Sequence, residues 1–211
     1  MRPETQYVTR SAPGRLKHRE MSQPNDWTDD GLLRLAMAGD EEAFRHLYRR
    51  NHPPIYRFAL HMSGNKAIAE DVTQEVFMAL IHHPKSFDPR RGTLGGFLFG
   101  IARNQLRKRW GQEQRLVPLP EAFEESQVDH DSSHTSFETV ARVRQAVGSL
   151  PAGYREAVVL CDLEGMTYEE AASALDCPVG TVRSRLHRAR ALLVEKLRER
   201  QSVIRASAVG E

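Results

Sequence analysis

The chain has 211 residues, with 30 Lys and Arg against 28 Asp and Glu, so its formal net charge is only +2. This length accommodates one large domain or two small ones. No apolar run approaches the ~20 residues that span a membrane, and the polar start lacks the apolar segment of a secretory signal. The two cysteines, Cys161 and Cys177, have no C-x-x-C spacing, which argues against a disulfide framework or a cysteine zinc site. We therefore expect a soluble cytoplasmic protein without membrane insertion.

The charge is segregated along the chain. One basic cluster comprises Arg103, Arg107, Lys108 and Arg109, and a second runs from Arg183 to Arg200. An acidic stretch lies between them. Two basic surfaces joined by an acidic tether predict two contacts on a polyanion.

The first half of the chain has a helical pattern. Residues 1–26 lack apolar periodicity, which predicts a disordered N-terminal tail. From 27 to 110 the apolar spacing is helical throughout. We expect one helix to end near Gly39, and a second to be capped by Asp40 and to kink or restart at Pro53-Pro54. A third helix should occupy 66–82 and a fourth should follow the loop 85–93.

A second helical unit is predicted for residues 137–200. The preceding residues, 111–136, contain Pro118, Pro120 and several acids, as is typical of a flexible linker. Val140, Val143 and Val147 have the spacing of an inward helix face. Residues 201–211 are expected to form a disordered C-terminal tail. The predicted fold class is all-α: two small helical domains joined by a flexible acidic linker, with a helix-turn-helix in the C-terminal one.

The helix-turn-helix occupies residues 167–193. Thr167 and Glu170 have the spacing of a capping box that starts its first helix. Pro178 fits the first position of the second helix, where its missing N–H costs nothing. These signals predict a capped helix, a tight turn and a second helix.

The second helix of this motif separates apolar from polar residues. Val182, Leu186, Ala189 and Leu193 recur with the spacing of one buried face. The polar side chains that project elsewhere are Thr181, Arg183, Ser184, Arg185, His187 and Arg188. A recognition helix needs such residues to reach base edges in the major groove. A solvated basic face is the alternative, but the capped first helix and the turn favour DNA recognition.

Two other functions fit parts of the pattern. In a stand-alone helix-turn-helix regulator, the N-terminal unit would dimerise or sense a ligand, and the protein would bind a palindrome without polymerase. An enzyme or metalloprotein could use His82-His83, or the i, i+4 pair His130 and His134, which has Asp129 and Asp131 close by. Such a pair binds a metal only where the segment is helical and a third ligand converges, so in an acidic linker we favour incidental histidines. No nucleophile elbow or phosphate-binding glycine loop occurs. We expect no catalytic residue, no metal site and no cofactor.

Residues 29–200 resemble the extracytoplasmic-function (ECF) sigma factors, the minimal two-domain members of the bacterial sigma-70 family. The resemblance rests on Glu70–Phe77, Phe87–Gly92 and Phe97–Asn104, followed by Leu150-Pro151, Gly165–Ala172 and Val179–Leu186. It implies an alternative sigma factor that binds core RNA polymerase and promoter DNA and helps to melt the duplex. Residues 27–110 would be sigma region 2 and residues 137–200 would be sigma region 4.

The resemblance also assigns roles to individual residues. Asp71, Gln74, Glu75 and Phe77 would dock on the clamp helices of the polymerase. The −10 element would be held, with one base flipped out, by Arg90, Arg91, Thr93, Phe97, Arg103, Asn104, Arg107 and Lys108. The six polar residues of the recognition helix would bind the −35 element. The linker 111–136 would thread through the polymerase active-site region, and an anti-sigma factor would mask both domains.

The chain departs from the family pattern at the start of the −10 helix. Gly95, Gly96 and Gly100 stand where bulkier or basic residues are common, and Phe97 replaces a frequent Trp. Each glycine costs a helix about 1 kcal/mol relative to alanine. The sequence therefore predicts a weakened helix at this point.

Overall fold

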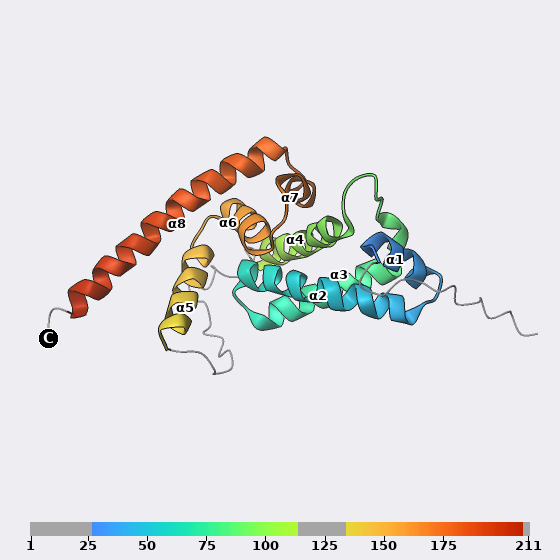
Figure 1. Cartoon of the computed structure of the whole chain (residues 1–211), viewed down its shortest axis with the longest axis horizontal. Coiled ribbons are helices and arrows are strands. Elements are labelled where there is room, and N and C mark those ends of the chain that lie inside the picture. The colour runs from blue at the N-terminus through green and yellow to red at the C-terminus, as the bar shows by residue number, and fades with distance from the viewer. Residues whose placement is uncertain (1–26, 114–133, 209–211) are drawn as a thin grey trace, which may run out of the picture.

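The computed structural model describes residues 27–113 and 134–208 (Figure 1). Within these two ranges every regular element is a helix, which confirms the predicted all-α class. The predicted tail 1–26 and most of the predicted linker lie outside the described residues. The elements are α1 (Asp29–Met37), α2 (Glu41–Ser63), α3 (Lys66–His82), the short 3-10 turn η2 (Pro84–Ser86), α4 (Leu94–Glu113), α5 (His134–Gly148), α6 (Ala152–Val158), the π-helical turn η3 (Val159–Leu163), α7 (Tyr168–Leu175) and α8 (Val179–Ala208).

Side-chain caps and one glycine define the helices of the N-terminal unit, α1–α4. The Asp40 carboxylate accepts the N–H groups of Glu42 and Ala43, which confirms the predicted cap of α2. Gly64 ends α2 in the left-handed region, at φ 68°, where glycine has no steric penalty. Asn65 then caps α3, accepting from Ile68 N–H at 3.1 Å.

The helix does not restart at Pro53-Pro54, one of the two outcomes expected there, because both prolines lie inside the single helix α2. Proline removes two backbone donors there, but the buried side chains on either side, including Asn51, Ile55 and Phe58, keep the helix in place. Burial of these side chains outweighs the local preference for a break.

The C-terminal unit, α5–α8, differs from the prediction at three points. Val140 and Val143 of α5 are 45% and 38% exposed, so only Val147 of the predicted inward face is buried. Helix α5 begins at His134, within the predicted linker. Helix α8 continues to Ala208 instead of ending at residue 200, since no proline or glycine occurs between residues 181 and 209.

The two units pack against each other. Helix α4 lies along α7, and the C-terminal part of α2 contacts α5, α6 and η3 (Figure 1). Buried apolar residues from both units, such as Phe58, Leu98, Leu160 and Leu175, belong to one continuous core. Helix α8 is about 45 Å long at 1.5 Å per residue; it begins packed against this body, and its C-terminal part extends away from it (Figure 1).

Candidate polymerase and DNA interfaces

The helix-turn-helix has the geometry that its sequence predicts. Thr167 N–H donates to the Glu170 carboxylate at 2.9 Å, and Glu170 N–H donates to Thr167 Oγ1 at 3.2 Å, which confirms the capping box. Asp176 adopts a left-handed conformation at φ 47°, and Cys177 N–H donates to the Ala172 carbonyl at 3.1 Å. Pro178 stands just before the first helical residue and not at it, and its carbonyl accepts Thr181 N–H at 2.8 Å. The turn therefore fixes the angle at which α8 leaves α7.

The polar residues of α8 differ in their exposure to solvent. Val182, Leu186 and Ala189 are buried as predicted. Four of the six predicted −35 residues are exposed: Arg183, Ser184, His187 and Arg188. The other two, Thr181 and Arg185, are half-buried at the edge of this exposed face, and the Arg185 guanidinium packs over Gly153 of α6. The outward face is thus narrower than the sequence indicates.

Contacts with neighbouring elements orient α8. The guanidinium carbon of Arg183 lies 5.8 Å from the centroid of the Tyr168 ring, within the range of a cation–π contact. Arg190 donates to both carboxylate oxygens of Asp162, at 2.6 and 3.1 Å. This hydrogen bonding with Asp162 raises the pKa of Arg190. Both contacts join α8 to the elements that precede it.

Most of the predicted −10 residues line one side of a groove of about 790 Å³ between α4 and α7. Six of the eight line it: Arg91, Thr93, Phe97, Arg103, Asn104 and Arg107. Its opposite wall is formed by residues 172–174 of α7 and residues 176–178 of the turn. Arg90 and Lys108 are exposed and do not line the groove.

Several of these predicted −10 side chains contact other residues of the protein. Thr93 Oγ1 accepts Gly96 N–H at 3.2 Å and so caps α4. The Phe97 ring lies 5.6 Å from that of Phe87, centroid to centroid. Arg103 donates from Nε to Glu156 Oε1 of α6 at 2.8 Å, with the two side chains 14% and 6% exposed. Glu156 was not among the predicted site residues, although an acid directly before the apolar run 157–160 is a recognisable signal.

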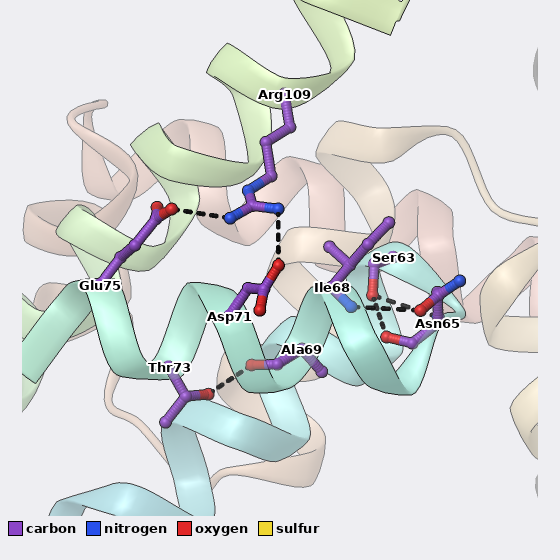
Figure 2. Close-up of polar contacts among 8 residues, drawn as sticks. All are labelled: Ser63, Asn65, Ile68, Ala69, Asp71, Thr73, Glu75 and Arg109. Carbon is purple, nitrogen blue, oxygen red and sulfur yellow. Dashed lines mark hydrogen bonds and ion pairs between the residues drawn. The ribbon is translucent and has the colours of Figure 1, made fainter.

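The predicted polymerase-binding residues lie on α3 but face two ways. Figure 2 shows Arg109 of α4 between two of them, with Nη1 3.3 Å from Asp71 Oδ2 and Nη2 2.7 Å from Glu75 Oε1. Gln74 and Phe77 instead line a second groove, of about 670 Å³, between α2 and α3. Phe77 is 3% exposed, so it forms part of the groove wall. Arg109, grouped by sequence with the basic cluster, is paired with these carboxylates.

Other groups considered from the sequence have ordinary surroundings. His82 is exposed, with Nδ1 2.7 Å from the Met78 carbonyl, while His130 and the His134 side chain lie outside the described residues. Among the described residues, no group of three or more His, Cys, Asp or Glu could hold a metal ion. Burial, with a smaller effect of Asp162, raises the pKa of Cys161 to about 11. None of the helices in the described ranges has the length and apolar character of a membrane span.

Comparison with known proteins identifies the family. The model of sigma-70 region 2 matches residues 47–116, and that of sigma-70 region 4 matches residues 141–193. The ECF RNA polymerase sigma factor SigE of Mycolicibacterium smegmatis is 34% identical over 220 aligned positions, which cover 95% of this chain and 82% of the relative. The chain belongs to the ECF sigma factors. This sigma factor is also 33% identical to EcfG of Rhodopseudomonas palustris over 67% of its length and 77% of that relative.

Solved structures agree with this membership. The structure of CnrH in complex with the cytosolic domain of CnrY has a TM-score of 0.63 and 29% identity, covering 81% of this chain and 97% of that one. The sigma factor RpoE of Bartonella quintana, in complex with the anti-sigma factor NepR, has a TM-score of 0.59 and 32% identity, covering 74% and 96%. The protein is therefore an alternative sigma factor that directs promoter recognition by RNA polymerase. The stand-alone regulator is set aside.

Proposed function

We propose that the outward face of α8 reads the −35 element and that the α4 face with its preceding loop holds the −10 element. The first role rests on the four exposed residues Arg183, Ser184, His187 and Arg188, which the capped α7 and the tight turn present together. Arginine pairs with guanine edges or phosphates, and serine contacts either kind of group. This outward face is the observation that carries the assignment, with Thr181 and Arg185 supporting it from the half-buried side.

The proposed −10 face combines cations with an aromatic pair. Arg90, Arg91, Arg107 and Lys108 are exposed and suit the phosphates of the non-template strand. Phe87 and Phe97 flank the groove in which an unstacked base would be held. Trapping an unstacked base favours strand opening without any bond being made or broken, so we propose that this sigma factor has no catalytic activity of its own.

Docking on core polymerase is assigned to α3. Gln74 is exposed, and Asp71 and Glu75 are 61% and 42% exposed at the side chain despite their contact with Arg109. These acids would meet basic groups on the polymerase clamp helices. The linker 111–136 would pass through the polymerase active-site region. Because core RNA polymerase and promoter DNA lie in the bacterial cytoplasm, we place the protein there.

The solved relatives in complex with CnrY and NepR favour an anti-sigma partner for this chain as well. Such a partner would mask the polymerase and DNA faces. We assign no cofactor and no metal to any of these surfaces.

In vitro transcription tests the proposed function. Purified protein and core RNA polymerase would be assayed together and separately on a library of promoter fragments. We expect transcripts only when both are present, from promoters that share two elements. Tight DNA binding by the protein alone, without association with polymerase, would refute it.

A further inference from the structure

One cation of the basic cluster on α4 has surroundings different from those of its neighbours. Arg107 and Lys108 are exposed, whereas the Arg109 side chain is 27% exposed and lies against α3 (Figure 2). Its two terminal nitrogens contact one oxygen of Asp71 and one oxygen of Glu75. Arg109 is therefore engaged with the acids proposed to dock on polymerase, and not with the groove that the −10 residues line.

The exposed fractions of the three charged side chains indicate how they are layered. Asp71 is 61% exposed and Glu75 is 42% exposed, against 27% for Arg109. The guanidinium thus lies beneath the two carboxylates, which reach further into solvent. A carboxylate has two oxygens with about four lone-pair sites, so one contact with Arg109 leaves each acid able to accept from a further donor. A cationic side chain of a partner can therefore reach both acids without displacing Arg109.

The packing of α3 against α4 fixes the position from which Arg109 acts. Val72 and Val76 of α3 and Leu106 of α4 belong to the core, and each is at most 1% exposed. Arg109 follows Leu106 by three residues, so it leaves α4 near this buried contact. Arginine presents its donors in a rigid planar fork, which suits it to hold two carboxylates in one geometry.

The two acids have a reason to need such a cation. Asp71 and Glu75 are one helical turn apart on α3, at i and i+4, where like charges repel each other. Without a cation between them, their side chains would favour rotamers that separate the carboxylates. Ordering the side chains of an interface costs free energy at the moment of binding. Arg109 meets this cost in the free chain, before any partner arrives.

We propose that Arg109 is a positioning residue for docking on RNA polymerase, and that it holds the carboxylates of Asp71 and Glu75 in the arrangement that a guanidinium or ammonium group of the polymerase binds. The inference rests on the assignment of α3 as the docking helix under Proposed function. Arg109 acts on the polymerase through the two acids and makes no contact with it. Its removal should therefore matter only while the acids are charged.

Polymerase binding in the absence of DNA tests this role. The fluorescence anisotropy of the dye-labelled full chain, titrated with core RNA polymerase at fixed salt, gives the Kd. Arg109→Gln should weaken this binding about fivefold. Arg34→Gln is the matched control, because it removes the same charge from an exposed side chain of α1 whose Nε donates to the Asp30 carbonyl of the same helix. The control should keep the wild-type Kd, and an Arg109→Gln variant that binds like Arg34→Gln would overturn the proposal.

A second background separates positioning from a structural role. Asp71→Asn with Glu75→Gln replaces both carboxylates by neutral amides of the same size, and this background should bind polymerase more weakly than the wild type. Adding Arg109→Gln to it should cause no further loss. A residue that only stabilises the fold, or that contacts polymerase itself, would lower the affinity by the same factor in both backgrounds, and that result would contradict positioning.

Two other results would also count against the proposal. Tighter polymerase binding by Arg109→Gln in the wild-type background would show that Arg109 competes with the polymerase for the acids. Wild-type affinity for Asp71→Asn with Glu75→Gln would refute the docking assignment of α3, and the positioning role with it. These two outcomes distinguish failure of the inference from failure of the proposed function.

Arg109→Lys supplies a second variant if Arg109→Gln fails to fold, which circular dichroism melting curves would reveal. Lysine keeps the positive charge but replaces the planar fork by a single ammonium group. Arg109→Lys should weaken polymerase binding in the wild-type background and have no effect beside the two amides. Equal losses in the two backgrounds would overturn the positioning role here as well.

Discussion

Glu156→Gln should strengthen binding of single-stranded DNA by the free chain. The substitution keeps the size of the side chain and leaves an oxygen that accepts from Arg103, but it removes the charge from a pair 2.8 Å apart. The Arg103 guanidinium is then held less firmly against α6 and is freed for DNA phosphates. Glu156 has no assigned DNA contact of its own and acts on DNA binding through its pair with Arg103.

The expected magnitude follows from the burial of the pair, whose side chains are 14% and 6% exposed. A hydrogen bond to a charged group contributes about 1.5–3 kcal/mol, and the substitution removes part of this because only the guanidinium stays charged. The pair should therefore lose about 1 kcal/mol, which is roughly a fivefold change in the equilibrium between paired and unpaired Arg103.

Anisotropy titrations with single-stranded DNA, at fixed salt, measure the effect. Glu169→Gln on α7 is the matched control, since it removes the same charge from an exposed side chain. Arg103→Gln also breaks the pair but removes a proposed phosphate contact, so it should weaken binding. The two members of the pair thus have opposite expected effects. Equal affinities for Glu156→Gln and Glu169→Gln, or a gain in affinity for Arg103→Gln, would refute the reasoning.

Four other predictions concern single sites. Arg183→Ala should weaken binding to the −35 element by about 1–3 kcal/mol if the residue reads a base, whereas loss of a phosphate contact would weaken binding to all sequences alike. Transcription from promoters with different −35 elements separates the two, with the exposed Arg198→Ala as control. Thr167→Ala should remove the cap of α7, cost about 1 kcal/mol and lower the melting temperature by about 3 °C, and an unchanged melting curve would show that the cap is dispensable. Burial, with smaller effects of Arg144 and Arg57, lowers the pKa of His61 below 6.5, so the folded state resists protonation and loses stability as the pH falls below that value. Urea unfolding from pH 7.5 to 5.5 should show this fall in the free energy of unfolding, and the fall should be smaller for His61→Asn. Because burial raises the pKa of Cys161 to about 11, its native thiolate fraction at pH 8 is about 0.1%, so mass spectrometry should find slow alkylation that urea accelerates.

Local signals in the sequence predicted most of the helices and their ends. The caps at Asp40 and Thr167 each depend on neighbours a few residues away, and both are present in the structure. The buried face of α8 was predicted for the same reason, because its period follows from helix geometry. Pro53-Pro54 does not restart the helix as one of the predicted outcomes required, since burial of the surrounding helix face is not a local property.

Contacts between the two units could not be read from periodicity. Gly100 looked like a defect in α4 because its neighbour, the Ala174 carbonyl, is distant in sequence. Arg103 and Arg109 looked like free cations until their carboxylate partners were placed beside them. Residue type and spacing predict which faces are polar or apolar, but pairing across units is a property of the tertiary structure.

Helix α4 contacts α3 through Arg109 on one side and α7 through its glycines on the other. If docking on polymerase through α3 changes the position of α4, thermodynamic linkage requires the reverse effect at equal strength. Promoter DNA bound to α4 must then increase the affinity of the sigma factor for polymerase by the same factor by which polymerase increases its affinity for DNA. A weak promoter would, on this basis, also be one from which the polymerase releases its sigma factor more readily.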